Sequence, residues 1–391
     1  MNIVLFDDQL RGQFLPLTYT RPIADLRIGI TKIDKKYEHL FNASVFYQTE
    51  DYLQEKFKTA PSDQETLYIN SRFLPDQRLV DCVKSLSFDE VLKTETSLVA
   101  YRLKAGEALD ISSKKVTTYT HENIEIKHVW DLFSYNHRAI QDDFNRITSG
   151  RESEEIPRHV YVVNPSQIFI EKGATVHNAS LNASEGPIYI GKNAEVMENT
   201  AVRGPFALCE SSVLKMGAKI YTGTTIGPHS KVGGEVSNSV ITGYSNKGHD
   251  GFLGNSVLGE WCNIGADSNT SNLKNNYAGV KLWDYSKERF TDTGLQFCGL
   301  IMGDHSKSAI NAMFNTGTII GVSTNIFGSG FPRNFVPSFS WGGSQGVKTY
   351  NFKKAMEVAA IVMKRRQLDL TETERDILEK VYELTQAYRR D

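Results

Sequence analysis

Aliphatic residues recur at every sixth position through the middle of the chain. All eight members of one series are aliphatic, and six of the seven residues that stand four positions after its first seven members are small. A helix cannot keep this series on one face, because six residues turn it by about 600°, and a half-buried strand needs a period of two. One inward aliphatic and one small residue in every six suit a short strand followed by a corner. Three such units close a triangular coil, and stacked coils about 4.8 Å apart pair their backbone groups. The series is Ile190, Val196, Val202, Leu208, Leu214, Ile220, Ile226 and Val232.

The six-residue spacing is broken after Val232, and it resumes in two later segments. Eight residues separate Val232 from Val240, with two glycines as the extra pair, and counting by six from Val240 places the polar Asn246 in one inward position. The resumed counts are Val240, Asn246, Phe252, Leu258 and Ile264, then Met302, Ser308, Phe314, Ile320 and Ile326, with Ile170 and Val176 as an earlier fragment. We therefore predict a parallel β-helix over residues 157–345. A polar loop at 267–299 interrupts it, and a loop this long inside a regular coil is usually functional.

The segments that flank the repeats have other patterns. Residues 1–118 alternate strands and helices, beginning with the strand NIVLF, which predicts a shortened α/β domain. Residues 119–156 predict a helical linker. Residues 346–391 predict two helices, the second with a capping-box pair at Thr371 and Glu374. We expect these helices to cover the open end of the coil stack, which would otherwise present bare strand edges.

Composition and charge indicate which kinds of partner and which cellular compartment to expect. The chain has 391 residues and a formal net charge of -2, with Lys and Arg spread along it, so neither nucleic acid nor a membrane surface is an expected partner. The start MNIVLFDD lacks the basic residues and long apolar run of a signal peptide. The four cysteines are far apart and form no CxxC pair, which predicts reduced thiols. We expect a cytoplasmic protein.

The six-residue series resembles that of the hexapeptide-repeat acyltransferases, whose fold is the left-handed parallel β-helix. Within it, the segment SNKGHDGFLGNSVLGEWCNIGADSNTSN resembles the active-site coil of the bifunctional enzyme family that acetylates glucosamine-1-phosphate and then uridylates it. The matching residues are Gly248-His249, Leu253-Gly254, Asn263-Ile264-Gly265-Ala266 and Thr270 to Asn272. The segment PLTYTRP, residues 16–22, resembles the turn near the start of sugar nucleotidyltransferase domains. The domain order is also that of the bifunctional family, and the likeness is closest to a divergent, shortened branch.

This resemblance implies roles for individual residues. His249 would be the general base that accepts a proton as a sugar amine attacks acetyl-CoA, a task that suits histidine because it exchanges its proton near neutral pH. Asn263 and Asn272 would hydrogen-bond the sugar. Phe252, at the place of a family tyrosine, and Lys247 are further candidates for substrate binding. The implied acceptor is an amino-sugar phosphate or a nucleotide sugar, and the implied assembly is a homotrimer.

The N-terminal half departs from the family pattern at its phosphate site. Its loop FDDQLRGQF contains the single glycine Gly12, whereas the family holds nucleotide phosphates on the backbone N–H groups of a Gly-rich loop. Ser71-Arg72 stands where a Gly-Asp pair brings a Mg²⁺ ligand. The candidates for nucleotide or phosphate binding are Arg21, Asp8 and Arg72. Mg²⁺ is the implied metal if this domain transfers a nucleotidyl group, with its ligands unassigned.

Two other functions stay open at this point. The first is a nucleotide-sugar-binding or assembly protein with an inactive N-terminal domain. The second is a metal hydratase similar to the γ-class carbonic anhydrases, which hold zinc on three histidines of the same type of coil. His229, His249 and His305 are available for this, although their spacing does not resemble the closely spaced set of that family.

Overall fold

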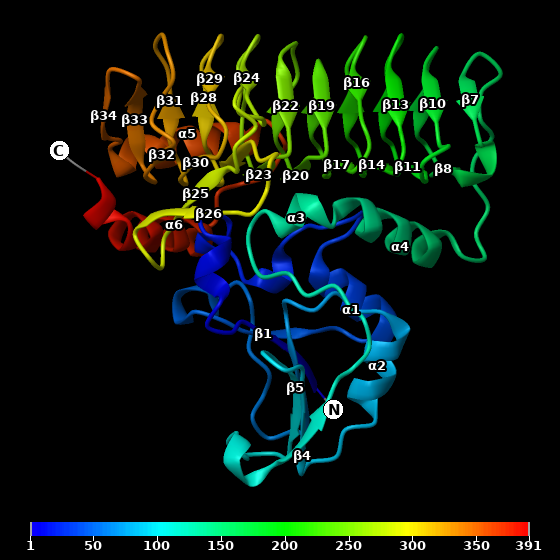
Figure 1. Ribbon diagram of the computed structural model, residues 1–391, viewed down its shortest axis with the longest axis vertical. Helices are drawn as coiled ribbons and strands as arrows, with labels where there is room; N and C mark the ends of the chain where they lie inside the picture. Colours follow the sequence, from blue (N-terminus) through cyan, green and yellow to red (C-terminus); the bar gives the residue numbers. More distant parts are fainter. Residues whose placement is uncertain (1, 390–391) are drawn as a thin grey trace.

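The chain folds into an N-terminal α/β domain, a linking helix and a long parallel β-helix that is followed by two helices (Figure 1). The computed structural model describes residues 2–389. The N-terminal sheet has the order β2-β1-β3-β5-β4-β6, in which β1 pairs in parallel with β2 and β3 while β5 runs antiparallel to β3 and β4. Its strands are β1 (Asn2–Phe6), β2 (Phe46–Gln48), β3 (Thr66–Asn70), β4 (Glu90–Lys93), β5 (Leu98–Leu103) and β6 (Lys115–Thr118).

The N-terminal domain and the linker carry four α-helices and short 3₁₀ turns. The predicted first strand, NIVLF, is β1, and it is buried along its whole length. The α-helices are α1 (Ile33–Phe41), α2 (Gln77–Lys84), α3 (Asp131–Ser134) and α4 (Asn136–Thr148). The 3₁₀ turns are η1 (Arg11–Phe14), η2 (Leu17–Tyr19), η3 (Ile23–Asp25), η4 (Asp51–Leu53) and η5 (Ile111–Ser113), with η6 (Pro165–Gln167) and η7 (Gln386–Tyr388) further along the chain.

The β-helix is a left-handed, three-sided prism of about 10 turns. Its first face consists of β7 (Tyr161–Val163), β10 (Ser180–Asn182), β13 (Ala201–Arg203), β16 (Lys219–Ile220), β19 (Glu235–Ser237) and β22 (Phe252–Gly254), continued by β24 (Asn269–Thr270) and β29 (Met313–Phe314). The second consists of β8 (Ile168–Ile170), β11 (Ile188–Ile190), β14 (Phe206–Leu208), β17 (Thr224–Ile226), β20 (Val240–Gly243), β23 (Val257–Glu260), β27 (Leu300–Met302), β30 (Thr318–Ile320) and β32 (Phe335–Val336). The third consists of β9 (Thr175–Val176), β12 (Glu195–Val196), β15 (Val213–Leu214), β18 (Lys231–Val232), β21 (Asn246–Lys247), β28 (Lys307–Ser308), β31 (Asn325–Ile326), β33 (Ser340–Gly343) and the antiparallel β34 (Gly346–Thr349).

The first aliphatic series lines the prism as predicted. In the second series the first three inward residues lie one position later than predicted, whereas Leu258 and Ile264 lie inside as predicted. All eight members from Ile190 to Val232 lie in the interior cluster. The next coil is short: Ile226 pairs with Ile241, an interval of 15 residues (241 minus 226), whereas Leu208 to Ile226 spans 18. The inward residues are therefore Ile241, Lys247 and Leu253, and the prediction of Val240, Asn246 and Phe252 was wrong.

The predicted register was wrong because the second face is buried on both of its sides. Val240 and Ile241 are both fully buried, but Val240 points out of the prism. There it joins a core that the second face shares with the N-terminal domain and with the C-terminal helices. The other outward members of this shared core on the second face are Val257, Ile301 and Ile319. A strand buried on both sides shows no alternation of apolar and polar residues, so the sequence gives no sign of which aliphatic residue faces inward.

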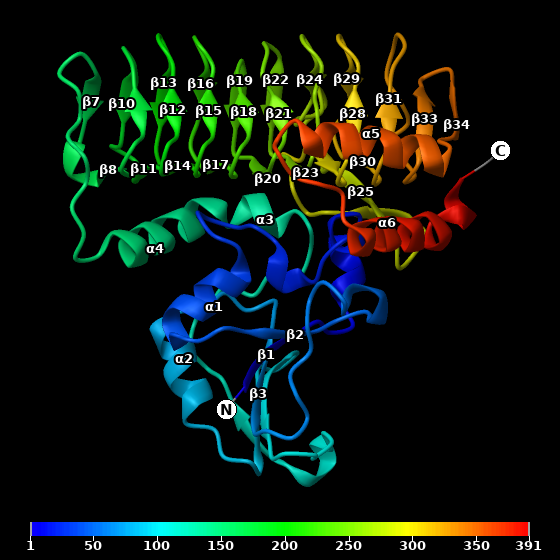
Figure 2. The same cartoon turned by 180° about the vertical axis from the view of Figure 1, so that it is seen from behind.

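The second face also packs against the linker helix α4. Phe169 and Ala207 of that face contact Ile140 and Phe144 in one buried cluster, and the side-chain amide of Asn136 donates to the carbonyl of Gly223 at 2.7 Å. Figures 1 and 2 show α4 running along the underside of the coils, with the N-terminal domain below it. The linker helix is therefore held against the early coils of the second face.

The C-terminal helices differ in place from what we expected, and the long interruption has strands of its own. The interruption contains a hairpin of β25 (Lys281–Asp284) and β26 (Arg289–Asp292) that lies against the N-terminal domain. The helices are α5 (Phe352–Lys364) and α6 (Glu372–Leu384), and α6 begins with the predicted capping box. α5 lies along the third face, and α6 lies between the prism and the N-terminal domain (Figure 2), so neither covers the open end.

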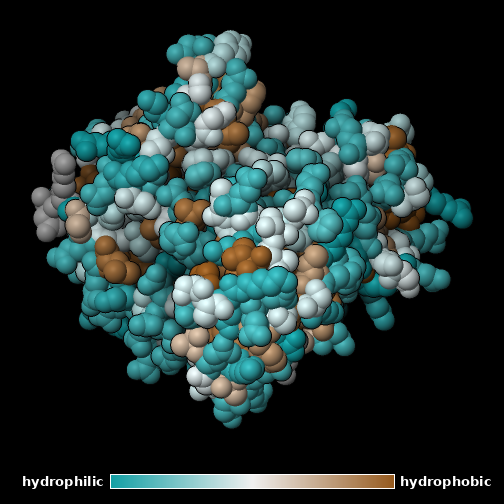
Figure 3. Space-filling model, turned by 60° about the horizontal axis from the view of Figure 1, so that its bottom comes forward, coloured by the Kyte–Doolittle hydropathy of each residue, from teal (hydrophilic) through white to brown (hydrophobic). Residues whose placement is uncertain are grey.

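The described chain has no helix that is long and apolar enough to cross a membrane. On the face shown in Figure 3, hydrophobic residues form small separate patches among hydrophilic ones.

The inward register makes Leu253 a core residue and Phe252 an outward one. Leu253 is 2% exposed and lies in the prism interior, while Phe252 is half-buried. We expect Leu253→Ala to lower the free energy of unfolding by about 2–5 kcal/mol and Phe252→Ala to cost less, although phenylalanine loses more atoms. Urea unfolding of the two variants measures this. A larger loss for Phe252→Ala would restore the register that the sequence suggested.

Candidate active site and nucleotide site

His249 lies at a corner of the prism, between β21 on the third face and β22 on the first. Its side chain is exposed, and it makes no hydrogen bond or ion pair with any other residue of the range 2–389. Two glycines let this corner pack tightly against the coils on either side. A Cβ on Gly234 would meet the carbonyl oxygen of His249 at 2.8 Å, and a Cβ on Gly251 would meet that of Ser268 at 2.1 Å. Gly251 also has φ +114°, a conformation that other residues rarely adopt.

Lys247 anchors the backbone of this corner from inside the prism. It occupies an inward position in register with Val232, and it is 2% exposed. Its ammonium group donates to the carbonyl of Gly233 at 3.0 Å and to the carbonyl of His249 at 2.6 Å. Burial lowers the pKa of Lys247 to about 8. The lysine therefore fixes the backbone on which His249 is presented, and its own side chain points away from solvent.

The other candidate substrate residues lie elsewhere on the prism. Asn263 is exposed on the third face, where its backbone bridges β21 and β28. Asn272 lies beside Phe252 and Gly254 at the far end of β22, and its side-chain amide donates to Asn255 at 2.8 Å. One chain therefore places Asn263 and the pair Phe252–Asn272 on different faces of the prism, with His249 at the corner between those faces.

The three histidines considered for zinc do not come together. His229 and His305 belong to a stack of left-handed residues along the corner between the second and third faces, in which Tyr244 and Trp261 separate them. His249 lies on another corner. Burial lowers the pKa of His305 to about 3 and keeps it neutral. Within residues 2–389 no group of three or more His, Cys, Asp or Glu side chains could hold a metal ion.

In the N-terminal domain, Arg72 occupies the centre of an acidic cluster. Its side chain is 1% exposed, and its guanidinium group pairs with Asp8 and with Glu125, each at 2.6 Å. Burial alone would raise the pKa of each carboxyl, but hydrogen bonds from Arg72 and from Asn70 hold Asp8 below its ordinary pKa, and those from Ser97 and Arg72 do the same for Glu125. The carboxylates at the end of β1 are thus neutralised by an arginine of the same chain.

These residues do not fit the Mg²⁺ ion that the family pattern implies. Asp8 and Glu125 are paired with Arg72, and Asp7 faces Arg11 at 3.2 Å and accepts hydrogen bonds from Thr49 and the backbone of Ile23. Burial raises the pKa of Asp7 to about 6. A divalent ion binds carboxylate oxygens that are free to coordinate it, and here each of the three carboxylates is already paired with an arginine, Asp8 and Glu125 with Arg72 and Asp7 with Arg11.

Arg21 lies at the junction of the two domains. Its guanidinium group pairs with Asp304 and, at 3.1 Å, with Glu260 of the β-helix and Asp25 of its own domain. Lys32 adds two more contacts, at 2.9 Å to Asp25 and 3.2 Å to Glu260. Sequence analysis missed the two β-helix acids, because neither belongs to a motif. Its assignment of Arg21 to phosphate binding stays a prediction, and phosphate contact would require Arg21 to release these carboxylates.

Known proteins match both parts of the chain. Residues 3–152 match the family model of sugar nucleotidyl transferases. The bifunctional protein GlmU of Methanocaldococcus jannaschii is 25% identical over 334 residues, which is 81% of this chain and 67% of that protein. These matches fit a divergent GlmU-type protein. An uncharacterised acetyltransferase of Escherichia coli, YaiX, is 26% identical over 148 residues, which is 37% of this chain and 64% of YaiX.

The chain is thus a transferase that is similar to two curated proteins and spans about two thirds of the length of each. Among solved structures, the UDP-N-acetylglucosamine acyltransferase of Arabidopsis is 15% identical, covers 55% of this chain and 80% of its own, and has a TM-score of 0.23.

The buried position of Lys247 predicts a stability that depends on pH. Its pKa is about 8 in the folded chain against 10.5 ordinarily, so the unfolded state binds more protons between these values and stability rises with pH across that window. We expect the free energy of unfolding of the wild type, relative to that of Lys247→Met, to rise by roughly 1–3 kcal/mol between about pH 8 and pH 10.5. Urea unfolding across that range measures the difference. Lys219→Met, at an exposed lysine, serves as the control, and a stability difference between the wild type and Lys247→Met that does not change with pH would contradict the assignment.

Proposed function

We propose that the β-helix transfers an acetyl group from acetyl-CoA to an amino-sugar phosphate or a nucleotide sugar, with His249 as general base. The observation that carries the proposal is the exposed imidazole at a corner whose backbone is held by Gly234, Gly251 and the buried ammonium of Lys247. A catalytic base needs a fixed position and open access to substrate, and this corner gives both. The match to GlmU and to an acetyltransferase supports the same reaction class.

In this reaction the amine nitrogen attacks the thioester carbonyl while His249 accepts the nitrogen's proton. The carbon–sulfur bond then breaks, and the thiol of coenzyme A leaves with a proton. Backbone N–H groups at the coil edge are the natural donors to the developing oxyanion. Asn263, Asn272 and Phe252 remain our candidates for sugar contact.

We infer that the functional unit is a homotrimer. Within one chain, Asn263 and Asn272 lie on two different faces, so a second copy packed at the His249 corner would complete the site. Apolar side chains are exposed on both sides of that corner along the prism: Met216 is 70% exposed, Ile310 66% and Met313 37%. Such exposed apolar residues along one edge favour an interface.

The N-terminal domain has a second candidate role. Its acidic cluster is paired with Arg72, which favours a domain that binds a nucleotide sugar or supports assembly over one that transfers a nucleotidyl group with Mg²⁺. The β-helix would then be the catalytic part of the chain. We place this activity in the cytoplasm, where acetyl-CoA and sugar phosphates are available.

The role of His249 is testable by thiol release from acetyl-CoA with a panel of amino sugars, their 1-phosphates and nucleotide sugars. We expect His249→Ala to lower kcat by about 100-fold or more, because general base catalysis contributes about 10²–10⁴-fold. His137→Ala, at an exposed histidine of α4, is the matched control and should keep full activity. Equal rates for His249→Ala and an active wild type would remove this histidine from the mechanism.

The assembly is testable by light scattering on the eluted protein. Three copies of the 43.9 kDa chain should give about 132 kDa (three times 43.9). The double variant Met216→Glu and Ile310→Glu should give the monomer mass, because charge at the corner opposes burial. The control is the double variant Ile361→Glu, on α5, and Leu368→Glu, after α5. Both side chains are exposed, and this variant should leave the mass unchanged. A monomeric wild type with full activity would overturn the trimer.

A further inference from the structure

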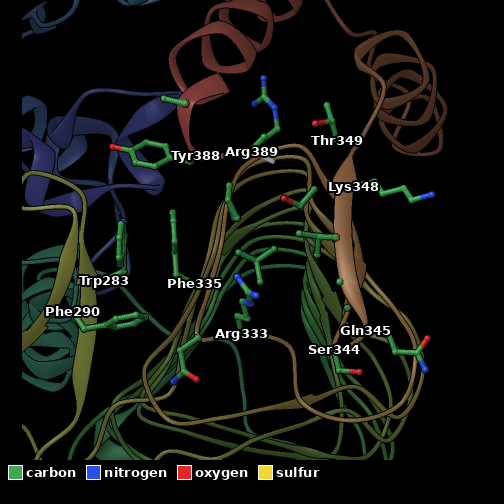
Figure 4. Close-up of a pocket in the computed structure, with 18 of the residues that line it drawn as sticks. Trp283, Phe290, Arg333, Phe335, Ser344, Gln345, Lys348, Thr349, Tyr388 and Arg389 are labelled. Atoms are coloured by element: carbon green, nitrogen blue, oxygen red, sulfur yellow. The ribbon is translucent and has the colours of Figure 1, made fainter. Parts of the chain in front are cut away.

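A cavity of about 1090 Å³ lies at the open end of the β-helix, where the C-terminal helices were expected to form a cover. Its walls come from three segments that are far apart in the chain: the hairpin β25–β26, the last coil with its β33–β34 turn, and η7 at the end of the described chain. Figure 4 shows these segments surrounding the mouth of the prism. The volume slightly exceeds the range of small-molecule sites, about 300–1,000 Å³.

One wall of the cavity is aromatic. Trp283 of the hairpin and Phe335 of the last coil stack at 4.4 Å with an angle of 7° between their rings. Phe290 meets Trp283 edge-on at 5.4 Å and is 42% exposed, and Tyr388 meets Phe335 edge-on at 5.8 Å. In Figure 4 the ring of Phe290 extends towards the cavity. The wall thus offers an aromatic surface on which a planar ring can stack.

The cavity is also basic, although the chain as a whole carries a net charge of -2. Its lining includes five cationic residues and no Asp or Glu: Lys274, Lys281, Arg333, Lys348 and Arg389. Arg333 is exposed, has no ion-pair partner within residues 2–389, and points into the mouth of the prism in Figure 4. Lys348 points away from it, Lys274 donates to the carbonyl of Gly279, and Arg389 donates to neutral oxygens of Thr385 and Tyr382.

One carboxylate reaches the edge of the cavity. Glu288, in the turn of the hairpin, accepts a hydrogen bond from the hydroxyl of Tyr388. It lies outside the lining residues, so it does not offset the positive charge that Arg333 and Lys281 present to the cavity.

We propose that this cavity binds a nucleoside diphosphate. The base would stack on the exposed face of Phe290 beside Trp283, and the two phosphates would bind the guanidinium group of Arg333, whose planar fork suits phosphate oxygens. A nucleoside diphosphate would use both the aromatic wall and the cation, whereas a simple anion would use only the cation and an apolar molecule only the wall. The same chemical group occurs in nucleotide sugars, as UDP, and in coenzyme A, as ADP.

This site is separate from the corner that holds His249. Along the third face, β21 is followed by Asn263, β28, β31 and β33, which is four strand steps. At about 4.8 Å a step, the corner and the cavity lie on the order of 19 Å apart along the prism. Binding in the cavity is therefore measurable independently of acetyl transfer.

Calorimetric titration of the full chain with UDP, ADP, uridine and inorganic pyrophosphate tests the proposal. We expect UDP or ADP to bind more tightly than uridine or pyrophosphate alone, and the preference between UDP and ADP to identify the source of the ligand. Arg333→Gln should weaken binding about tenfold, and Phe290→Ala about fivefold or more. His249→Ala should bind as the wild type does, even if its role in acetyl transfer proves wrong.

Arg365→Gln, at an exposed arginine just after α5, is the matched control for loss of one positive charge, and it should leave binding unchanged. Three results would each overturn the proposal: no nucleotide binding at millimolar concentration, pyrophosphate binding as tightly as UDP and ADP, or an equal loss in Arg333→Gln and Arg365→Gln. Both cavity variants change exposed side chains, and circular dichroism spectra identical to that of the wild type would show that they fold.

Discussion

The backbone pairing between successive coils determines which side chains face the interior of the prism and where the candidate active site lies. Each strand of the prism has only two to four residues, so one or two side chains per strand fill the interior. The backbone ladder then sets the direction of every neighbouring side chain, because successive residues point to opposite sides. Once Lys247 takes an inward position, its ammonium group can satisfy the carbonyls of the corner, and His249 two residues later must lie at that corner. The candidate active site is thus a consequence of register.

A second constraint is the burial of charge between and within the domains. Arg21 and Lys32 face Asp25, Glu260 and Asp304 at the domain junction, where folding brings one segment of the N-terminal domain against two distant acids of the β-helix. Breaking such a buried pair by removing one partner is costly, whereas the intact pair is close to neutral for stability. The network therefore fixes the orientation of the N-terminal domain on the prism.

Sequence analysis predicted the prism and eight of its inward residues from the strict period of six, and it predicted the two helices after the prism from their own pattern and the capping-box pair. It failed where both sides of a strand are apolar, as at Val240 and Ile241, since burial against a second domain removes the polar residues that would mark the outside. The corner of His249 was identified by resemblance, while the anchoring by Lys247 follows only from the corrected register. Glu260 and Asp304 carry no local signal at all.

The segment that interrupts the repeats contacts the N-terminal domain, the last coil and the C-terminal part of the described chain. Tyr285, in the turn after β25, contacts Tyr19 of the N-terminal domain, Phe335 of the last coil and Tyr388 near the C-terminus, each edge-on at between 5.4 and 5.7 Å. Gln13 of the loop FDDQLRGQF donates to Asp284 and Ser286 of the same hairpin at 3.3 Å. This loop of the N-terminal domain thus has a fixed contact with the segment that interrupts the β-helix. The same hairpin supplies the aromatic wall of the cavity at the open end of the prism. A single inserted segment therefore connects the N-terminal domain to that cavity.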